Sequence, residues 1–250
     1  MDIKSKFIKL NDLDIEYFDE GEGEDFLLLH GGGGSFRSYL NFIDELSNKY
    51  HVWAPSLPGA GKSSKLPLSW RFDKYADVIK GFIDYHNINP IIAGHSFGGA
   101  VAIKSKSMYP DNFKALILIS SAGVKHKKPM KIIFKVAKWM AFELKKKDKR
   151  KNDKIFIQET ELNLKKHKID LLRIGRLFCK LDLTKDLKSI KDRIIVLWGV
   201  NDDTLEYSDF IKICNAVVDE DAVLVEGDHG FVTDDYKNVA KIINAKLNEK

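Results

Sequence analysis

The stretch "GHSFGG" at residues 94–99 constrains the fold more than any other part of this 250-residue chain. It follows the apolar run "PIIA", which is typical of a buried strand, and precedes residues 98–108, whose pattern is typical of a helix. A chain that passes from strand to helix within so few residues must turn sharply, and glycines two positions before and after Ser96 make that turn possible. The sequence therefore predicts a corner that projects the Ser96 hydroxyl above a sheet, at the start of a helix.

Strand-like and helix-like segments alternate along most of the chain. Strands are predicted at the runs "FLLLHG", "HVWAPS", "PIIAGH", "KALILISSA", "RIIVLWGV" and "AVLVEG", and helices at residues 38–48, 74–86, 98–108, 206–217 and 233–247. Strands that are apolar throughout are buried on both faces, and helices between them supply the crossovers of a parallel sheet. We therefore expect an α/β fold, with a mostly parallel sheet and helices on both faces.

Residues 123–193 differ from the rest of the chain in charge. They contain 23 Lys and Arg against 9 Asp and Glu, whereas the remainder contains 18 against 27. Two runs in this segment, "PMKIIFKVAKWMAF" and "NLKKHKIDLLRIGRLFCKL", place apolar residues at helical spacing between basic ones. This change predicts a core domain made of residues 1–123 and 193–250, with a helical insertion at residues 124–192.

Two further motifs at predicted strand ends complete a candidate nucleophilic site around Ser96. A serine hydroxyl is a weak nucleophile that needs a base, and the base needs an acid to orient it. His229 in "EGDHGF" is the candidate base and Asp202 in "LWGVNDD" the candidate acid, in the chain order that such sites follow on an α/β sheet. Asp203 remains an alternative acid, and Asp228 a weaker one. Taken singly, each of these residues also fits an ordinary turn.

A glycine-rich run, "HGGGG", follows the first strongly apolar strand. Bare backbone N–H groups at a strand end can hold the negatively charged oxygen that develops during acyl transfer. Gly32 is the preferred donor, with Gly33 next, and the N–H of Phe97 at the head of the predicted helix would complete the pair. We expect His30 and His95 to be structural, holding loops through hydrogen bonds.

The run "SLPGAGKSS" at residues 56–64 looks like part of a phosphate-binding loop, but two requirements are missing. The pattern G-x-x-x-x-G-K-[ST] needs a glycine five residues before Gly61, where this chain has Ser56. A helix should also begin at such a loop, yet a short polar run with Pro67 follows it. The sequence therefore argues against a nucleotide site.

Taken together, the motifs resemble those of the α/β-hydrolase superfamily over nearly the whole chain. The matching runs are "LLLHGGGG", "SLPGAGKSS", "GHSFGG", "LWGVNDD" and "GDHGF", in the family's order. The resemblance implies a sheet of the eight-stranded type and identifies the insertion at 124–192 as a helical cap. It also implies that Ser56, Gly59, Gly61 and Ser63 belong to the family's D-x-x-G-x-G-x-S turn beside the active site. Two departures, at Ser56 for the usual Asp and at Ala60 for the usual His, bear on how this turn packs.

The resemblance further implies that the cap covers an apolar pocket for the acyl part of a substrate. The candidate pocket residues are Trp139 and Phe142 from the cap, and Phe36 and Phe231 from the core. The alternative is that each of these aromatic side chains only packs the cap and the core together.

The expected function is that of a serine hydrolase that cleaves a small carboxylic ester with an apolar acyl part. Serine at position 96 argues against the family's dehalogenases and epoxide hydrolases, which carry Asp there. Family members with the same three residues also hydrolyse C–C bonds beside ketones, act as aminopeptidases or act as lyases, and these alternatives stay open. A binding protein that keeps the fold without catalysis is less consistent with a complete Ser, Asp and His set.

Composition narrows the expected partners and location. No cofactor is expected, and Cys179 and Cys214 lack metal-ligand spacing, so we expect no metal and two buried thiols in a reducing cytoplasm. The chain has no apolar run of membrane-spanning length and no secretory signal at its start. Nucleic acid is not an expected partner, because no recognition motif accompanies the lysines. The basic insertion is either a solvated face or a weak contact for an acidic membrane surface or carrier protein, and the oligomeric state is not indicated.

Overall fold

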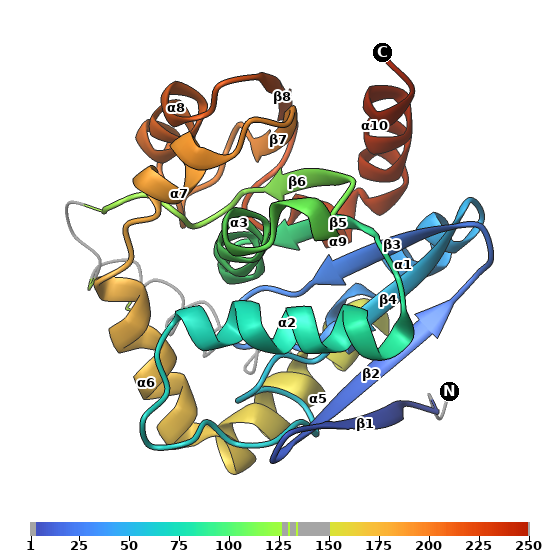
Figure 1. Cartoon of the computed structure of the whole chain (residues 1–250), viewed down its shortest axis with the longest axis vertical. Coiled ribbons are helices and arrows are strands. Elements are labelled where there is room, and N and C mark those ends of the chain that lie inside the picture. The colour runs from blue at the N-terminus through green and yellow to red at the C-terminus, as the bar shows by residue number, and fades with distance from the viewer. Residues whose placement is uncertain (1–3, 127–129, 131–133, 135–150, 250) are drawn as a thin grey trace.

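The computed structural model describes residues 4–126, 130, 134 and 151–249 (Figure 1). These residues contain one eight-stranded sheet with the strand order β1-β2-β4-β3-β5-β6-β7-β8. The strands are β1 (Lys6–Leu10), β2 (Leu13–Glu20), β3 (Glu24–Leu29), β4 (Tyr50–Pro55), β5 (Ile91–His95), β6 (Ala115–Ile119), β7 (Ile194–Gly199) and β8 (Glu220–Val225). β2 is antiparallel to both of its neighbours, and the pairs from β4 through β8 are parallel. The predicted mostly parallel sheet is confirmed.

Helices cover both faces of this sheet (Figure 1). The described helices are α1 (Leu40–Ser47), α2 (Asp73–His86), α3 (Phe97–Met108), α5 (Lys151–Lys166), α6 (Lys168–Cys179), α7 (Thr184–Ser189), α8 (Tyr207–Ala216), α9 (Phe231–Asp234) and α10 (Tyr236–Asn248), with 3₁₀ turns η1 (Phe36–Tyr39) and η2 (Pro110–Asn112). Side chains of α2, α3, α7 and α8 are buried on one face, and those of α1, α9 and α10 on the other. Within the described part of the chain, we find no helix with the length and apolarity needed to cross a membrane.

Strand β3 shows why the central strands are apolar throughout. Leu27 and Leu29 belong to the buried cluster that contains α2 and α3, whereas Phe26 and Leu28 belong to the cluster that contains α1 and α10. Successive side chains of a strand point to opposite faces, so both faces of β3 are covered. Each such side chain stabilises the fold by roughly 1.5–3 kcal/mol when it is fully buried.

The segment predicted as an insertion leaves the core after β6 and returns before β7. In its described part, α5 packs on η1 and on α6. The last helix, α7, packs instead on α3 and α8, and its Leu187 is buried in the same cluster as side chains of β6 and β7. α7 therefore covers the sheet itself, although it lies inside the predicted boundaries 124–192.

Candidate active site

The four motifs predicted to form a site follow strands that end at one edge of the sheet. The glycine run follows β3, Ser96 follows β5, and the loops after β7 and β8 carry Asp202 and His229. Because these strands are parallel, their carboxyl ends lie on the same side, where open α/β sheets place their ligand sites.

Ser96 lies at the corner between β5 and α3, with φ 53° and ψ −117°, a backbone conformation that L residues seldom adopt. The flanking residues must be glycines because there is no room for a side chain at either position. A Cβ on Gly94 would lie 2.4 Å from the Gly98 oxygen, and one on Gly98 would lie 2.3 Å from the Leu29 oxygen. The Ser96 N–H donates to the Ile119 oxygen of the neighbouring strand (3.0 Å), so the sheet holds the corner in place.

Gly98→Ala is expected to destabilise the protein by about 3 kcal/mol or more, because the added methyl group meets backbone atoms that cannot move aside. Gly81→Ala in α2 is the matched control. A Cβ there meets only the Cδ atoms of Leu10, at 3.6 and 3.7 Å, and alanine should stabilise the helix by up to about 1 kcal/mol. Urea unfolding followed by circular dichroism measures both variants. Equal stability of the two would contradict this description of the corner.

The side chains of Ser96, His229 and Asp202 form one hydrogen-bonded line. His229 Nε2 lies 3.0 Å from Ser96 Oγ, and His229 Nδ1 lies 2.7 Å from Asp202 Oδ2. A carboxylate only accepts, so Nδ1 carries a hydrogen, and Nε2 of the neutral ring can then accept the proton of the serine hydroxyl. The structure thus brings together three residues predicted from distant parts of the sequence, in the arrangement of a base acting on a serine.

Asp202 is held from its other side by the backbone. Its Oδ1 accepts hydrogen bonds from the N–H groups of Thr204 and Leu205, both at 2.9 Å. Burial raises the pKa of Asp202, but the hydrogen bond and charge of His229, with the N–H of Leu205, outweigh burial and leave that pKa below its ordinary value. Asp202 is therefore ionised at neutral pH, as an orienting acid must be.

The two alternative acids make other contacts. Asp228 Oδ1 accepts the Gly230 N–H at 2.7 Å, and Asp203 Oδ1 lies 3.4 Å from the Thr204 hydroxyl. Since the His229 ring is bonded to Asp202, the geometry favours Asp202 over both alternatives.

Gly32 and Phe97, the predicted oxyanion donors, lie against each other. A Cβ on Gly32 would come 3.5 Å from the Cβ of Phe97. Phe97 directly follows Ser96 and is the first residue of α3, so its N–H is one of the helix donors without an intrahelical partner. The backbone of Gly32 thus lies beside Phe97, the residue that follows the serine.

The peptide that carries the Gly32 N–H is fixed through its carbonyl group. The Gly31 oxygen accepts from His30 Nδ1 at 2.8 Å and from the Gly34 N–H at 3.4 Å. His30 is itself fixed, because its Nε2 accepts the Leu57 N–H at 2.9 Å. The N–H and C=O of a trans peptide point in opposite directions, so these bonds on the Gly31 oxygen set the direction of the Gly32 N–H.

His95 links the serine corner to the two loops beside it. Its Nε2 donates to the backbone oxygen of His229 at 2.9 Å, and its Nδ1 accepts the Tyr39 hydroxyl proton at 2.6 Å. The Tyr39 oxygen in turn accepts the Gly31 N–H at 2.9 Å. The expected structural roles of His30 and His95 are confirmed. No local pattern marks Tyr39, whose partners lie 8 and 56 residues away in the chain.

Acid is expected to destabilise the protein through these two buried histidines. Burial lowers the pKa of His30 to about 4 and that of His95 to about 3, from 6.5 in an exposed histidine. Between pH 6.5 and 4 the unfolded chain binds more protons than the folded one, so the free energy of unfolding falls as the pH falls. At pH 5 the expected loss is about 2 kcal/mol for each histidine.

Urea unfolding at pH 7.5 and pH 5 measures this effect. In His30→Asn, whose amide can still donate to the Gly31 oxygen, the difference between the two pH values should shrink by about 2 kcal/mol, because the contribution of this histidine is gone. A free energy of unfolding that stays constant between the two pH values would contradict the prediction.

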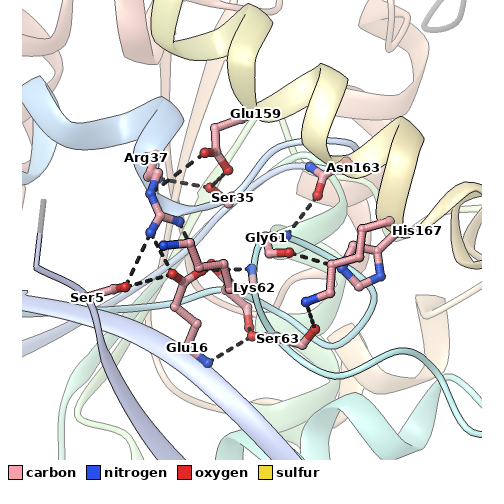
Figure 2. Close-up of polar contacts among 12 residues, drawn as sticks. Ser5, Glu16, Ser35, Arg37, Gly61, Lys62, Ser63, Glu159, Asn163 and His167 are labelled. Atoms are coloured by element: carbon pink, nitrogen blue, oxygen red, sulfur yellow. Dashed lines mark hydrogen bonds and ion pairs between the residues drawn. The ribbon is translucent and has the colours of Figure 1, made fainter. Parts of the chain in front are cut away.

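The N–H groups of the loop at residues 56–64 bind protein acceptors (Figure 2). The Gly61 N–H donates to Asn163 Oδ1 at 2.8 Å, and the Lys62 N–H donates to Glu16 Oε2 at 2.9 Å. A carboxylate and an amide oxygen thus occupy the positions that phosphate oxygens would take. The loop is a closed turn, as predicted, and not a phosphate cradle.

The predicted pocket residues divide into two groups. Phe36 and Phe231 are each 1% exposed and belong to the buried cluster under α1 and α10. They are packed in the core, so the prediction that they line a substrate pocket is not supported. Trp139 and Phe142 lie outside the described residues.

The described residues also bear on metals and thiols. Among them, no group of three or more His, Cys, Asp or Glu side chains has the geometry of a metal site. Cys179 and Cys214 carry free thiols and are half-buried, less covered than expected. Burial raises the pKa of Cys214 to about 11, so this thiol is un-ionised at neutral pH.

Comparison with protein families identifies the fold family. A model of the alpha/beta hydrolase fold matches residues 26–165, which is more than half of the chain and includes the glycine run and the serine corner. The chain belongs to the alpha/beta hydrolase fold family. The resemblance recognised in its motifs is therefore confirmed.

The relatives of this alpha/beta hydrolase are named for different reactions. It is 29% identical over 124 residues to the 2-hydroxy-6-oxo-6-(2'-aminophenyl)hexa-2,4-dienoic acid hydrolase of Metapseudomonas resinovorans, covering 48% of this chain and 43% of the relative. It is 33% identical over 108 residues to Lipase 3 of a Moraxella species, covering 42% of this chain and 34% of the relative. Among solved structures, an esterase from Exiguobacterium antarcticum superposes with a TM-score of 0.85 at 17% identity, covering 98% of this chain and all of the esterase, a likeness in fold. The chain spans less than half the length of the curated relatives it matches.

Proposed function

We propose that this alpha/beta hydrolase is a serine hydrolase that cleaves a carboxylic ester through an acyl-enzyme intermediate. The observation that carries the proposal is the line Ser96 Oγ, His229 Nε2, His229 Nδ1 and Asp202 Oδ2, with contacts of 3.0 and 2.7 Å. As oxyanion donors we propose the backbone N–H groups of Gly32 and Phe97, two residues that lie against each other. Nucleophile, base, orienting acid and oxyanion donors are the four parts that acyl transfer requires.

In the first half of the reaction, Ser96 Oγ attacks the ester carbonyl carbon while its proton passes to His229 Nε2. Asp202 keeps the ring in the correct tautomer and stabilises the imidazolium that forms. The carbonyl oxygen becomes an oxyanion held by the N–H groups of Gly32 and Phe97. The C–O bond to the alcohol then breaks, and the departing oxygen takes the proton from His229, leaving an acyl group on Ser96.

In the second half, water repeats the sequence. His229 Nε2 takes a proton from the water as its oxygen attacks the acyl carbon, and the same donors hold the second oxyanion. The bond from the acyl carbon to Ser96 Oγ breaks and the oxygen takes the proton back from His229. The products are a carboxylic acid, the alcohol and the free enzyme.

The lipase among the relatives supports an ester as the substrate class, and we propose a small ester with an apolar acyl part. The basic composition of residues 123–193 fits either a solvated surface or contact with an acidic membrane or carrier protein. Such a contact would weaken steeply as salt rises, because exposed charges are screened.

Hydrolysis of a C–C bond beside a ketone is the second candidate. It is favoured by one observation, the identity to a hydrolase of a 6-oxo dienoic acid. The same serine, histidine and oxyanion donors could act on a ketone carbonyl, so the site geometry alone does not separate the two reactions.

A substrate panel with an active-site probe tests the proposal. The panel contains p-nitrophenyl esters of increasing acyl length, a 6-oxo dienoate and prolyl-naphthylamide, and the probe is a fluorophosphonate. Ester turnover with labelling at Ser96 supports the proposal, and turnover of the dienoate alone favours C–C cleavage. No turnover and no labelling would favour a binding protein without catalysis.

A further inference from the structure

Helix α5 is attached to the core by buried polar side chains that meet the loops beside the proposed site (Figure 2). Glu159, Asn163 and the following His167 are spaced four residues apart, on one face, and are 5%, 0% and 0% exposed. Glu159 pairs with Arg37 at 3.7 Å, and His167 Nε2 donates to the Gly61 oxygen at 3.1 Å. Asn163 lies between these two attachments.

Asn163 joins two loops that are distant in sequence. Its Oδ1 accepts the Gly61 N–H at 2.8 Å, and its Nδ2 donates to the oxygens of Gly33 at 2.8 Å and Gly34 at 3.2 Å. These partners fix the orientation of the amide, because exchanging its oxygen and nitrogen would place a donor against a donor and an acceptor against two carbonyls. The side chain is fully buried, so each of the three partners would lose its hydrogen bond if Asn163 were removed.

The carbonyls that Asn163 holds belong to the turn that directs the proposed oxyanion donor. The Gly33 oxygen and the Gly34 N–H are part of one peptide plane, and this N–H donates to the Gly31 oxygen. The Gly31 oxygen in turn belongs to the peptide whose other end is the Gly32 N–H. A rotation of the plane that Asn163 holds would therefore release one of the bonds that set the Gly32 N–H.

We propose that Asn163 is a positioning residue that holds the glycine loop so that the Gly32 N–H points at the oxyanion. This inference rests on the proposed ester hydrolysis. Helix α5 of the predicted insertion would then help to position a catalytic group. A displacement of about 1 Å in a catalytic group can cost about 100-fold in rate, so a small shift of the loop would be measurable.

Two variants test this contact. Asn163→Asp keeps an acceptor for the Gly61 N–H but faces the oxygens of Gly33 and Gly34 with a carboxylate oxygen. Asn163→Ala removes all three hydrogen bonds and adds no charge. The attachments of α5 on either side of Asn163 remain in both variants. Near-ultraviolet circular dichroism checks the fold, and if one variant does not fold the other carries the same test.

Two neighbouring positions provide matched controls. Thr160 is 1% exposed, and its Oγ1 has no hydrogen-bond partner among the described residues, so Thr160→Val alters a buried polar group of α5 without touching the glycine loop. His167→Leu removes the hydrogen bonds to the Gly61 oxygen and to the Asp170 carboxylate and so weakens the docking of the insertion, while leaving Gly33 and Gly34 in contact with Asn163.

The measurement compares kcat and KM for a short p-nitrophenyl ester with the inhibition constant of a trifluoromethyl ketone of the same acyl length. Ser96 adds to the ketone to give an oxyanion, so this constant reports the oxyanion donors. Both Asn163 variants should lose roughly 10- to 100-fold in kcat, with the inhibition constant rising by a similar factor. KM should change by less than about threefold, since only the transition state carries the charge. Both controls should stay near the wild type.

Three outcomes would count against the inference. A folded Asn163→Ala with a wild-type inhibition constant would overturn it, and so would an equal loss in His167→Leu; either result leaves the proposed function intact. A wild-type protein that neither turns over the ester nor binds the ketone would overturn the proposed function, and this inference with it.

Discussion

Ser96→Ala is expected to lower kcat for p-nitrophenyl ester hydrolysis by about a million-fold, because it removes the only atom that can form the acyl-enzyme. The His229 ring and the backbone donors stay in place, so KM should change little. Ser96→Gly should be equally inactive but more stable by about 1 kcal/mol, since glycine adopts φ 53° without strain.

The comparison of these two variants separates chemistry from folding. Thermal unfolding measures the stability of each, and stopped or continuous absorbance assays measure the rate. An Ser96→Ala protein that retains more than a small fraction of wild-type kcat would show that another group carries the reaction.

Asp202→Asn is expected to lower kcat by about 10,000-fold with little change in structure. An asparagine amide can turn its N–H toward His229 Nδ1, which then accepts, and the hydrogen moves to Nε2. A ring protonated at Nε2 cannot take the proton of Ser96, although the two atoms stay 3.0 Å apart. The prediction is thus a loss of rate caused by the wrong tautomer.

Asp203→Asn is the matched control, because it makes the same chemical change one residue away. The His229 ring is bonded to Asp202, so removal of the Asp203 charge should leave kcat within about threefold of the wild type. Steady-state kinetics over pH 6 to 9 measure both variants. The reverse ranking, with Asp203→Asn the slower enzyme, would assign the acid to Asp203.

The parts of the fold and site that could be predicted from the sequence are those that depend on local constraints. Gly94 and Gly98 are needed because their Cβ atoms would collide with backbone, and such a constraint leaves a readable pattern. The strands of a sheet that is covered by helices on both faces also have a recognisable pattern, because they are apolar throughout. Once the strands are parallel, the topology alone brings Ser96, Asp202 and His229 to one edge.

Contacts made only by the tertiary fold could not be predicted in this way. Asn163 sits on a lysine-rich helix whose sequence does not show which face is buried, and its partners lie more than 100 residues away. Aromatic residues near a site suit an apolar ligand, and on this ground the sequence predicts Phe36 and Phe231 as pocket residues. The same residues suit a core equally well, and in the structure both are buried in the core cluster.

The central claim is that Ser96 carries an acyl group during turnover. Rapid-quench mass spectrometry of the wild-type protein with an excess of p-nitrophenyl ester tests it most directly. We predict a transient mass increase equal to one acyl group, located on the peptide that contains residues 94–99 and absent in Ser96→Ala. Ester turnover with the acyl group on a different peptide, or with no acylated protein under conditions that give a product burst, would contradict the account.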